Sequence, residues 1–576
     1  MNTEHVLNHK TVIYGFLVIN LFFNCHSNKG VETKKDENTT KLSIAQTLQE
    51  QENLPITEQI ALYHKLKKEN PYGYNFENED EMTMYGYRHL WNNQPNDALE
   101  IFKLIVEEFP NSSNPYDSLG EAYLAIGDSL MSLKNYEISL RLNPENFNAE
   151  DQIERIKYPH RIPITSKEKF AKTYDRQAYI ADLQQLGEKL LGVHPNALKF
   201  IGEADFWKTI EEKKSLITNN TTFAEFAWHC SEIIANINCS HTSMGSFSLE
   251  SDMLPKALRF PIQTRLINGR LYVIDGYTNS DKVSVKDEII EINHIPVSQL
   301  ISVVHKHIQS QGYIETTIYQ EFNMWSTVII PYALRFPEQY TIKVKGKPRP
   351  IELNKANSME VPYQDNSIPY CGKDLCLELN ENKKTAVMTL YSFNYYPWNN
   401  FDEFKQFVDE SFKKIKEKQV ENLIIDLRFN GGGSAESSIY LLKYLSRKPF
   451  AYLNGYGMQQ PFKDGYNGNL FFLMDGHGKS TTGHFMALAK ELGLGTIVGE
   501  ELGSNQFCTA GQTVLRLSST KLVYYVANTT SRLADINLPD EKGILPDYTI
   551  IQNIDDYLNK VDTVKEFAFK LISDQD

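Results

Sequence analysis

Two short stretches of the sequence contain the residue types that acyl transfer requires. The first is an apolar run that ends at residues 426–428 (Asp-Leu-Arg) and leads into three glycines at 431–433. The second is 479–484 (Lys-Ser-Thr-Thr-Gly-His), which follows another apolar run at 469–474 and opens a helical pattern. A serine at a strand-to-helix turn exposes its hydroxyl at the positive end of the helix, and glycine amides can donate to an oxyanion. The two stretches therefore predict a nucleophile and its oxyanion donors.

The surrounding pattern indicates which elements position these stretches. Residues 385–393 alternate as a strand, 401–418 form an amphipathic helical pattern, and 420–426 are the next strand. Strand, helix and strand on short connections imply a largely parallel sheet covered by helices. Further helices are expected at 434–445 and 482–492, after the glycines and after the serine turn.

Four motifs in this order resemble the S41 serine peptidases, the family of the C-terminal processing peptidases and of the tricorn protease core. They are the Asp-Leu-Arg-x-Asn-x-Gly-Gly run at 426–433, the serine turn, Thr-Ile-Val-Gly-Glu at 496–500 and Gly-Ile-Leu-Pro-Asp at 543–547. The resemblance covers roughly residues 165 to 555. It implies hydrolysis of polypeptide substrates without a metal or other cofactor.

Two catalytic arrangements occur in families of this kind. In C-terminal processing peptidases the base is a lysine twenty-five residues after the serine, and that position is Asn505 here. An amide cannot accept the serine proton, so the Ser–Lys pair is absent. The tricorn-like arrangement uses a serine, a histidine, a second serine and a glutamate, and its candidates here are Ser480, His241, Ser240 and Glu541.

The resemblance gives each candidate a role. Ser480 Oγ would attack the peptide carbonyl, and His241 would take its proton and later protonate the leaving amine. Ser240 and Glu541 would orient and polarise the site, as a carboxylate does in a serine triad. His484 lies four residues after the nucleophile and is an alternative base.

The remaining choices concern the oxyanion hole and the carboxylate. The backbone N–H groups of Gly432 or Gly433, together with that of Thr481, are the expected oxyanion donors. Asp540 and Glu500 are the alternatives for the supporting carboxylate.

Residues 76–155 resemble tetratricopeptide repeats. Pro110 and Pro144 are 34 residues apart, the length of one helix pair, and a Leu-Gly-x-x-Tyr piece begins at Leu119. About two repeats are present, fewer than the three or so that stand alone. We expect them to pack on a neighbouring domain or to bind a protein partner, and a purely structural spacer is the alternative.

Residues 255–355 are rich in strand patterns. The piece at 285–297 resembles the strand-turn-strand of a PDZ domain, a module that binds a peptide by adding it as a strand to a sheet edge. A PDZ-like β domain that captures peptides is therefore expected between a helical lead and the α/β core.

The N-terminus has the features of an export signal. The apolar run 11–23 follows Lys10 and is shorter than the roughly 20 residues that a spanning helix needs. It ends at Cys25, and the polar stretch 27–41 comes next. This pattern is typical of a bacterial lipoprotein with lipid attached to Cys25, held at a membrane of the cell envelope (periplasm or outer membrane). An ordinary cleaved signal with an incidental cysteine is the alternative.

Composition sets further bounds. A chain of 576 residues is too long for one core, and a formal net charge of −14 argues against a nucleic-acid surface. Five cysteines follow the lipobox cysteine. Cys371 could bridge Cys376, or Cys230 could bridge Cys239, but the odd count leaves one thiol over, and buried reduced cysteines are favoured. No cysteine has metal-ligand spacing.

We therefore expect a multidomain α+β protein with an α-helical repeat segment, a helical lead, a PDZ-like β domain and an α/β core of the S41 (ClpP/crotonase-like) type. The expected boundaries are 1–25 for the signal, 26–75 for a tether and helical lead-in, 76–155 for the repeats, 165–250 for the helical lead, 255–355 for the PDZ-like domain, 365–555 for the peptidase core and 556–576 for a C-terminal helix.

Three functions remain open on the sequence. The first is an exported serine endopeptidase with a Ser/His mechanism. The second is a catalytically inactive S41-like envelope lipoprotein that binds peptides or proteins through its repeats and PDZ-like domain. Retention of both Ser480 and His241 favours the enzyme, because a decayed site need keep neither. Hydrolysis of non-peptide esters is the third.

Overall fold

The computed structural model describes residues 41–161, 165–244, 253–356, 371–380, 384–397, 399–534, 536 and 538–574. The expected signal segment and Cys25 lie outside these residues. Among the described helices, none combines the length and apolarity needed to span a bilayer. The chain divides into two compact units, Met1–Pro163 with Pro397–Asn400, and Ile164–Tyr396 with Phe401–Asp576.

The first unit is helical. Its helices are α2 (Ile44–Gln49), α3 (Ile56–Glu69), α4 (Glu79–Trp91), α5 (Pro95–Glu108), α6 (Ser113–Ala125), α7 (Ser129–Leu142) and α8 (Phe147–Lys157). From α4 onward each helix packs against the next in the chain. Side-chain caps from Asn78, Asp128 and Asn146 begin α4, α7 and α8, so polar residues mark where each helix starts. The tetratricopeptide assignment stays a prediction.

The core of the second unit is a six-stranded sheet in the order β18-β13-β12-β9-β8-β7. Its strands are β7 (Leu375–Asn380), β8 (Thr385–Leu390), β9 (Asn422–Asp426), β12 (Asn469–Met474), β13 (Thr496–Gly499) and β18 (Tyr548–Thr549). All neighbouring pairs are parallel except β7 with β8. The predicted parallel sheet is confirmed, with one antiparallel edge strand.

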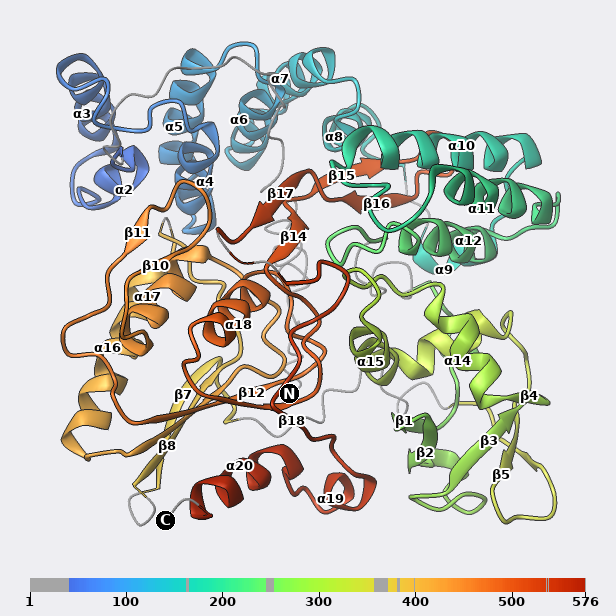
Figure 1. The fold of residues 1–576 in the computed structure, drawn as a ribbon. Helices are drawn as coiled ribbons and strands as arrows, with labels where there is room; N and C mark the ends of the chain where they lie inside the picture. The colour runs from blue at the N-terminus through green and yellow to red at the C-terminus, as the bar shows by residue number, and fades with distance from the viewer. Residues whose placement is uncertain are drawn as a thin grey trace, which may run out of the picture. The chain divides into compact units, whose positions relative to one another are not determined.

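Helices cover both faces of this sheet (Figure 1). On one face lie α16 (Phe401–Glu417), α17 (Ala435–Leu445) and α18 (Thr481–Glu491), which pack on residues such as Phe472. On the other lies α20 (Thr563–Ser573), which packs on Leu473. Successive strand residues point to opposite faces, so a strand covered on both sides is apolar throughout.

A second sheet is inserted before the core. It contains β1 (Gln263–Ile267), β2 (Arg270–Asp275), β3 (Glu288–Ile292), β4 (Ile295–Pro296), β5 (Thr341–Val344) and β6 (Ile351–Glu352). The order is β1-β2-β3-β5-β6 with β4 on β3, and every pair is antiparallel. Two helices, α14 (Val297–His305) and α15 (Glu315–Ala333), complete this inserted domain. Identity as a PDZ-like domain stays a prediction.

Helix α15 is absent from the sequence expectations. Its buried residues Ile318, Phe322, Trp325 and Ile329 are spaced by four, three and four, which is the signal of a helix with one apolar face. The strand patterns on both sides masked that period.

The helical lead packs on two small two-stranded antiparallel sheets. Its helices are α9 (Ser166–Phe170), α10 (Arg176–Val193), α11 (Glu203–Leu216) and α12 (Phe223–Ala235), and the sheets are β14 (Phe507–Ala510) with β17 (Thr529–Arg532) and β15 (Thr513–Arg516) with β16 (Val523–Val526). The remaining elements are η1 (Lys256–Leu258), η2 (Tyr277–Asn279), β10 (Phe450–Ala451), β11 (Met458–Gln459) and α19 (Ile554–Leu558). Ser243 pairs with Tyr525 of β16, which fixes the chain just after α12.

One cysteine expectation is wrong. Cys371 and Cys376 form a disulfide, where reduced thiols were favoured. The short turn between them, which leads into β7, brings their Cα atoms to 6.5 Å, within the range that a disulfide spans. Cys230, Cys239 and Cys508 are free and buried.

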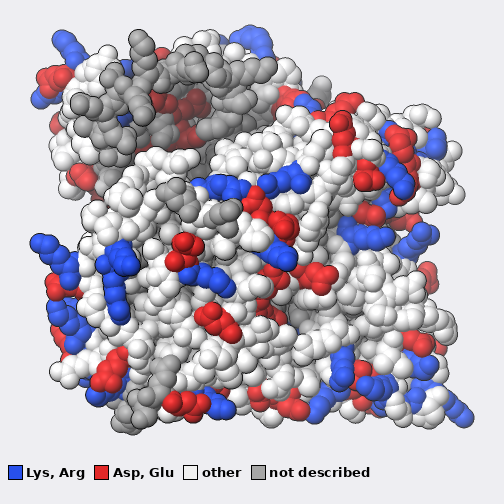
Figure 2. All heavy atoms as spheres, in the orientation of Figure 1, with Lys and Arg blue, Asp and Glu red and all other residues white. Residues whose placement is uncertain are grey.

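The charged side chains do not form a single-sign field on the viewed face. Figure 2 shows Lys and Arg interspersed with Asp and Glu over that face. Such a mixed surface gives no concentrated positive potential for a polyanion.

Candidate active site

Ser480 occupies the sharp turn between β12 and α18. Its backbone has φ 53° and ψ −125°, a conformation that non-glycine residues rarely adopt. Ser480 is half-buried at the N-cap of α18, but its hydroxyl makes no capping hydrogen bond. The turn therefore holds the hydroxyl at the positive end of the helix without engaging it, as expected of a nucleophile.

The glycine run lies against this turn. Strands β9 and β12 are neighbours, so the loops that follow their carboxyl ends meet at the same edge of the sheet. A Cβ added to Gly432, which has φ +99°, would lie 2.7 Å from Ser480 Cβ and 3.0 Å from Thr481 N. Only glycine allows this approach.

Asn430 ties the glycine run to β8 and to α18. Its buried side chain donates to Leu390 O (2.9 Å) and accepts from Gly432 N–H (3.0 Å) and Thr482 Oγ1 (2.8 Å). Asn430 belongs to the motif at 426–433, but no role was predicted for it. These bonds make Asn430 the residue that holds the glycine run at 431–433 in place.

The same bonds change the expected oxyanion donors. Gly432 N–H donates to Asn430 Oδ1 and is therefore already engaged. In the described part of the chain, no residue accepts from the N–H of Gly433 or of Thr481. Thr481 Oγ1 donates to Gly433 O (2.5 Å), which fixes the peptide orientation of the loop beside Ser480. Gly433 and Thr481 are therefore the better donor pair.

His241 follows α12 and lies in the same region as the nucleophile. It is close enough to Lys479 and to His484 for electrostatic interaction with each, and these two residues precede and follow Ser480. Ser240 Oγ lies 3.3 Å from His241 Nδ1, and Gln512 Nε2 donates to His241 O (2.6 Å).

The surroundings of His241 keep it neutral. Burial, and then the positive charge of Lys479, lower the pKa of His241 to about 4. A neutral imidazole is the form that can accept a proton. Within the described residues His241 and Ser480 Oγ are not hydrogen-bonded to each other, and catalytic hydrogen bonds often close only when substrate binds.

The expected carboxylate, Glu541, lines a cavity whose lining includes neither Ser480 nor His241. Its backbone O accepts from Tyr313 N–H (2.9 Å), and its side chain lines an open cavity of about 480 Å³. Among the described residues Glu541 makes no ion pair with the candidate base. The alternative Asp540 is paired with Lys199 (2.8 Å) and with Arg532, so its charge is already compensated.

The alternative base, His484, faces the core. Its side chain is 2% exposed, and its Nε2 lies 3.8 Å from Cys508 Sγ. Burial lowers the pKa of His484 to about 3. Gly483 occupies the place where the family commonly has an acid, and a Cβ there would lie 2.5 Å from Ser504 Oγ. An acidic side chain would not fit.

Asn505 replaces the lysine of the Ser–Lys enzymes and has a structural function instead. Its fully buried side chain donates to Pro539 O (3.1 Å), Asp540 O (2.9 Å) and Lys542 O (2.6 Å). Its Oδ1 accepts from Phe507 N–H (2.8 Å). These bonds hold the segment that contains Glu541, and residue type alone could not show them.

Asn505→Ala is therefore expected to destabilise the protein. The change leaves three part-buried carbonyl oxygens without their donor, and we expect the free energy of unfolding to fall by about 2 kcal/mol. Urea unfolding followed by near-ultraviolet circular dichroism measures this. Asn467→Ala is the control, because the side chain of the exposed Asn467 makes one long bond, to Gly465 O (3.4 Å). Equal unfolding midpoints for the two variants would contradict the structural role of Asn505.

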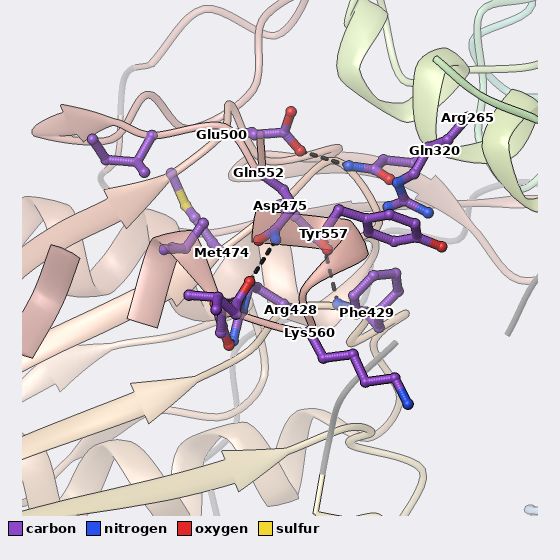
Figure 3. Close-up of a pocket in the computed structure, with 14 residues that line it drawn as sticks. Arg265, Gln320, Arg428, Phe429, Met474, Asp475, Glu500, Gln552, Tyr557 and Lys560 are labelled. Carbon is purple, nitrogen blue, oxygen red and sulfur yellow. Dashed lines mark hydrogen bonds and ion pairs between the residues drawn. The ribbon is translucent and has the colours of Figure 1, made fainter. Parts of the chain in front are cut away.

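A separate cavity of about 390 Å³ lies at the carboxyl ends of β9, β12 and β13 (Figure 3). Figure 3 shows Gln320 of α15 bonded to Glu500 of the core, with a donor–acceptor distance of 2.5 Å. Burial, and then the charge of Asp475, raise the pKa of Glu500 to about 7. Neither Ser480 nor His241 lines this cavity. Glu500 is thus engaged away from the candidate base.

Comparison with known proteins identifies the family. Residues 384–550 match the model of peptidase family S41. No curated protein matches the chain. Among solved structures, mature CPAF is 13% identical over 69% of this chain and 97% of that chain, with a TM-score of 0.48. Tricorn protease is 15% identical over 69% of this chain and 37% of that chain, with a TM-score of 0.32. The photosystem II D1 C-terminal processing protease is 13% identical over 66% of this chain and 96% of that chain, with a TM-score of 0.33. With these low TM-scores, the assignment rests on the family match and the motifs. The segment 384–550 thus matches peptidase family S41, a family of serine-type peptidases.

Proposed function

We propose that this chain is an exported, lipid-anchored serine endopeptidase that uses Ser480 as nucleophile and His241 as general base. One observation carries the proposal. Gly432 packs against the nucleophile turn, and His241 is within electrostatic range of Lys479, which precedes Ser480, and of His484, four residues after it.

The first half of the reaction forms an acyl-enzyme. Ser480 Oγ attacks the peptide carbonyl as its proton passes to His241 Nε2. For Nε2 to accept, Nδ1 must have the ring hydrogen, and Ser240 Oγ at 3.3 Å is placed to accept it. The N–H groups of Gly433 and Thr481 would then stabilise the oxyanion, at about 2.7–4 kcal/mol for each donor.

The second half returns the enzyme to its starting state. The carbon–nitrogen bond breaks as His241 gives its proton to the leaving amine. Water then attacks the acyl carbonyl and gives a proton to His241, and Ser480 recovers that proton when the carboxylic acid leaves. Glu541 is the carboxylate proposed to support the imidazolium.

Export and anchoring rest on other features. A disulfide such as Cys371–Cys376 persists in oxidising compartments, which agrees with export. Cys25 would then hold the lipid at a membrane of the cell envelope. The helical unit would bind a protein partner, and the expected domain boundaries remain part of this proposal.

A fluorophosphonate probe tests the mechanism, because it modifies only an activated serine. We expect stoichiometric labelling of Ser480 in the folded full chain, located by peptide mass spectrometry. Heat-unfolded protein and Ser480→Ala should take up no label. Absence of labelling together with no hydrolysis of casein would favour the inactive binding protein, and turnover of esters alone would favour an esterase.

The pH dependence follows from the lowered pKa of the base. Since the pKa of His241 is about 4, the imidazole stays unprotonated down to acidic pH, and kcat/KM should fall only below about pH 4–5. An unperturbed histidine would give a fall near pH 6.5. Initial rates on a peptide substrate between pH 3.5 and 8 distinguish the two, and a midpoint near 6.5 would contradict the described environment.

A further inference from the structure

We propose that helix α15 of the inserted domain positions the nucleophile turn, with Thr317 holding its backbone and Glu321 compensating the charge of Lys479. The inference rests on the proposed function of Ser480 and His241, and it adds two positioning residues from outside the peptidase core.

The first contacts fix the backbone ahead of the nucleophile. Thr317 Oγ1 donates to Gly476 O (2.8 Å), and Thr316 Oγ1 donates to Glu501 O (2.9 Å). The approach is close, because a Cβ on Gly476 would lie 2.5 Å from the carbonyl carbon of Thr316. The first turn of α15 is therefore bonded to the segments that follow β12 and β13.

The second contact is an ion pair beside the nucleophile. Lys479 Nζ lies 2.7 Å from Glu321 Oε1, and the two side chains are 20% and 22% exposed. Trp325 Nε1 donates to the other oxygen of Glu321 (3.2 Å). Burial alone would raise the pKa of Glu321, but Lys479 and then His477 outweigh it and lower that pKa. Glu321 is thus a carboxylate fixed by Trp325 and paired with Lys479, the residue before Ser480.

The helix is itself held in place by the inserted sheet. Strand β1 is at the edge of that sheet, and Asn323 closes the edge at Leu266. Asn323 Oδ1 accepts from Leu266 N–H (2.6 Å), and Asn323 Nδ2 donates to Leu266 O (3.0 Å). These are the bonds that an added peptide strand would make. The side chain of Asn323 makes these bonds instead, so helix α15 covers the edge of β1 at Leu266.

The charges around His241 show why the ion pair matters. His194 from the end of α10, His484 from α18 and Lys479 from the nucleophile turn interact with it. Burial lowers the pKa of His194 to about 4 and that of His484 to about 3, so both are neutral near pH 7. Lys479 is the remaining cation among these neighbours, and Glu321 is its counter-ion.

Two single variants should move the acid limb, which is the fall of kcat/KM at low pH, in opposite directions. Glu321→Gln leaves the ammonium of Lys479 uncompensated, so the limb should shift to lower pH and kcat should fall about three- to tenfold with little change in KM. Lys479→Met removes the cation, so the limb should shift to higher pH. The double variant leaves no unpaired charge, and its acid limb should lie between those of the two single variants.

Glu315→Gln is the matched control, because Glu315 lies in the first turn of the same helix and its side chain accepts from the hydroxyl of Tyr319 (3.3 Å). It should leave both kcat and the limb unchanged. If the acid limbs of Glu321→Gln and Lys479→Met do not move, or move in the same direction, the positioning role is overturned while Ser480 remains essential. If Ser480→Ala retains full activity, the proposed function itself fails.

Discussion

Replacement of Ser480 by alanine is expected to lower kcat by about 10⁴- to 10⁶-fold. The change removes the proposed nucleophilic hydroxyl from the strained turn while the proposed oxyanion donors remain. The residual rate would then come from the donors and from substrate binding alone. Initial rates on a fluorogenic peptide at saturating substrate measure the loss.

Ser302→Ala serves as the control for this variant. Ser302 is exposed on α14, and its hydroxyl bonds only within its own helix, to Ser298 O (2.9 Å). Its kcat should equal that of the unchanged protein. A Ser480→Ala protein that folds normally and keeps more than about one hundredth of the activity would exclude Ser480 as nucleophile.

His241→Gln should have the second largest effect, a loss of about 10⁴-fold in kcat. A glutamine amide can keep a hydrogen bond to Ser240 but cannot take the serine proton. The acid limb of the pH profile should vanish as well, because the group that titrates is gone. Activity measured between pH 3.5 and 9 gives both results.

Two further variants separate loss of the base from loss of structure. His64→Gln changes an exposed histidine of α3 and should leave the rate unchanged. His241→Ala opens a cavity, and added imidazole should restore part of its rate. Wild-type kinetics in His241→Gln would assign the base to another group.

The sequence was sufficient for the core of the site because local pattern and topology determine it. The buried strands that end at Asp426 and Met474 are parallel neighbours, so the loops after them had to meet. The glycines and Ser480 then fall at the same sheet edge. The family match over 384–550 agrees with that prediction.

Other features depend on partners far away in the chain. Gly432 was an expected oxyanion donor, but the side chain of Asn430 takes its N–H. Asn505 was known only as a missing lysine, and its three acceptors lie more than thirty residues further on. A residue's type gives its donors and acceptors, but only the tertiary fold decides which of them meet.

The supporting carboxylate shows the same limit. Glu541 was chosen by its distance from a motif, and the structure places its side chain along an open cavity beside Tyr313. Likewise Glu321 lies in a helix that the sequence did not predict, and it reaches the nucleophile turn across the domain boundary through Lys479. No linear spacing encodes either placement.

The most direct test of the account is the structure of the full chain with a peptide boronate, which forms a tetrahedral adduct on an activated serine. We predict a covalent bond from Ser480 Oγ to boron and one boronate oxygen within hydrogen-bond distance of Gly433 N–H and Thr481 N–H. His241 Nε2 should contact the adduct. A boronate attached to another residue, or an adduct on Ser480 that His241 does not reach, would contradict the central claim.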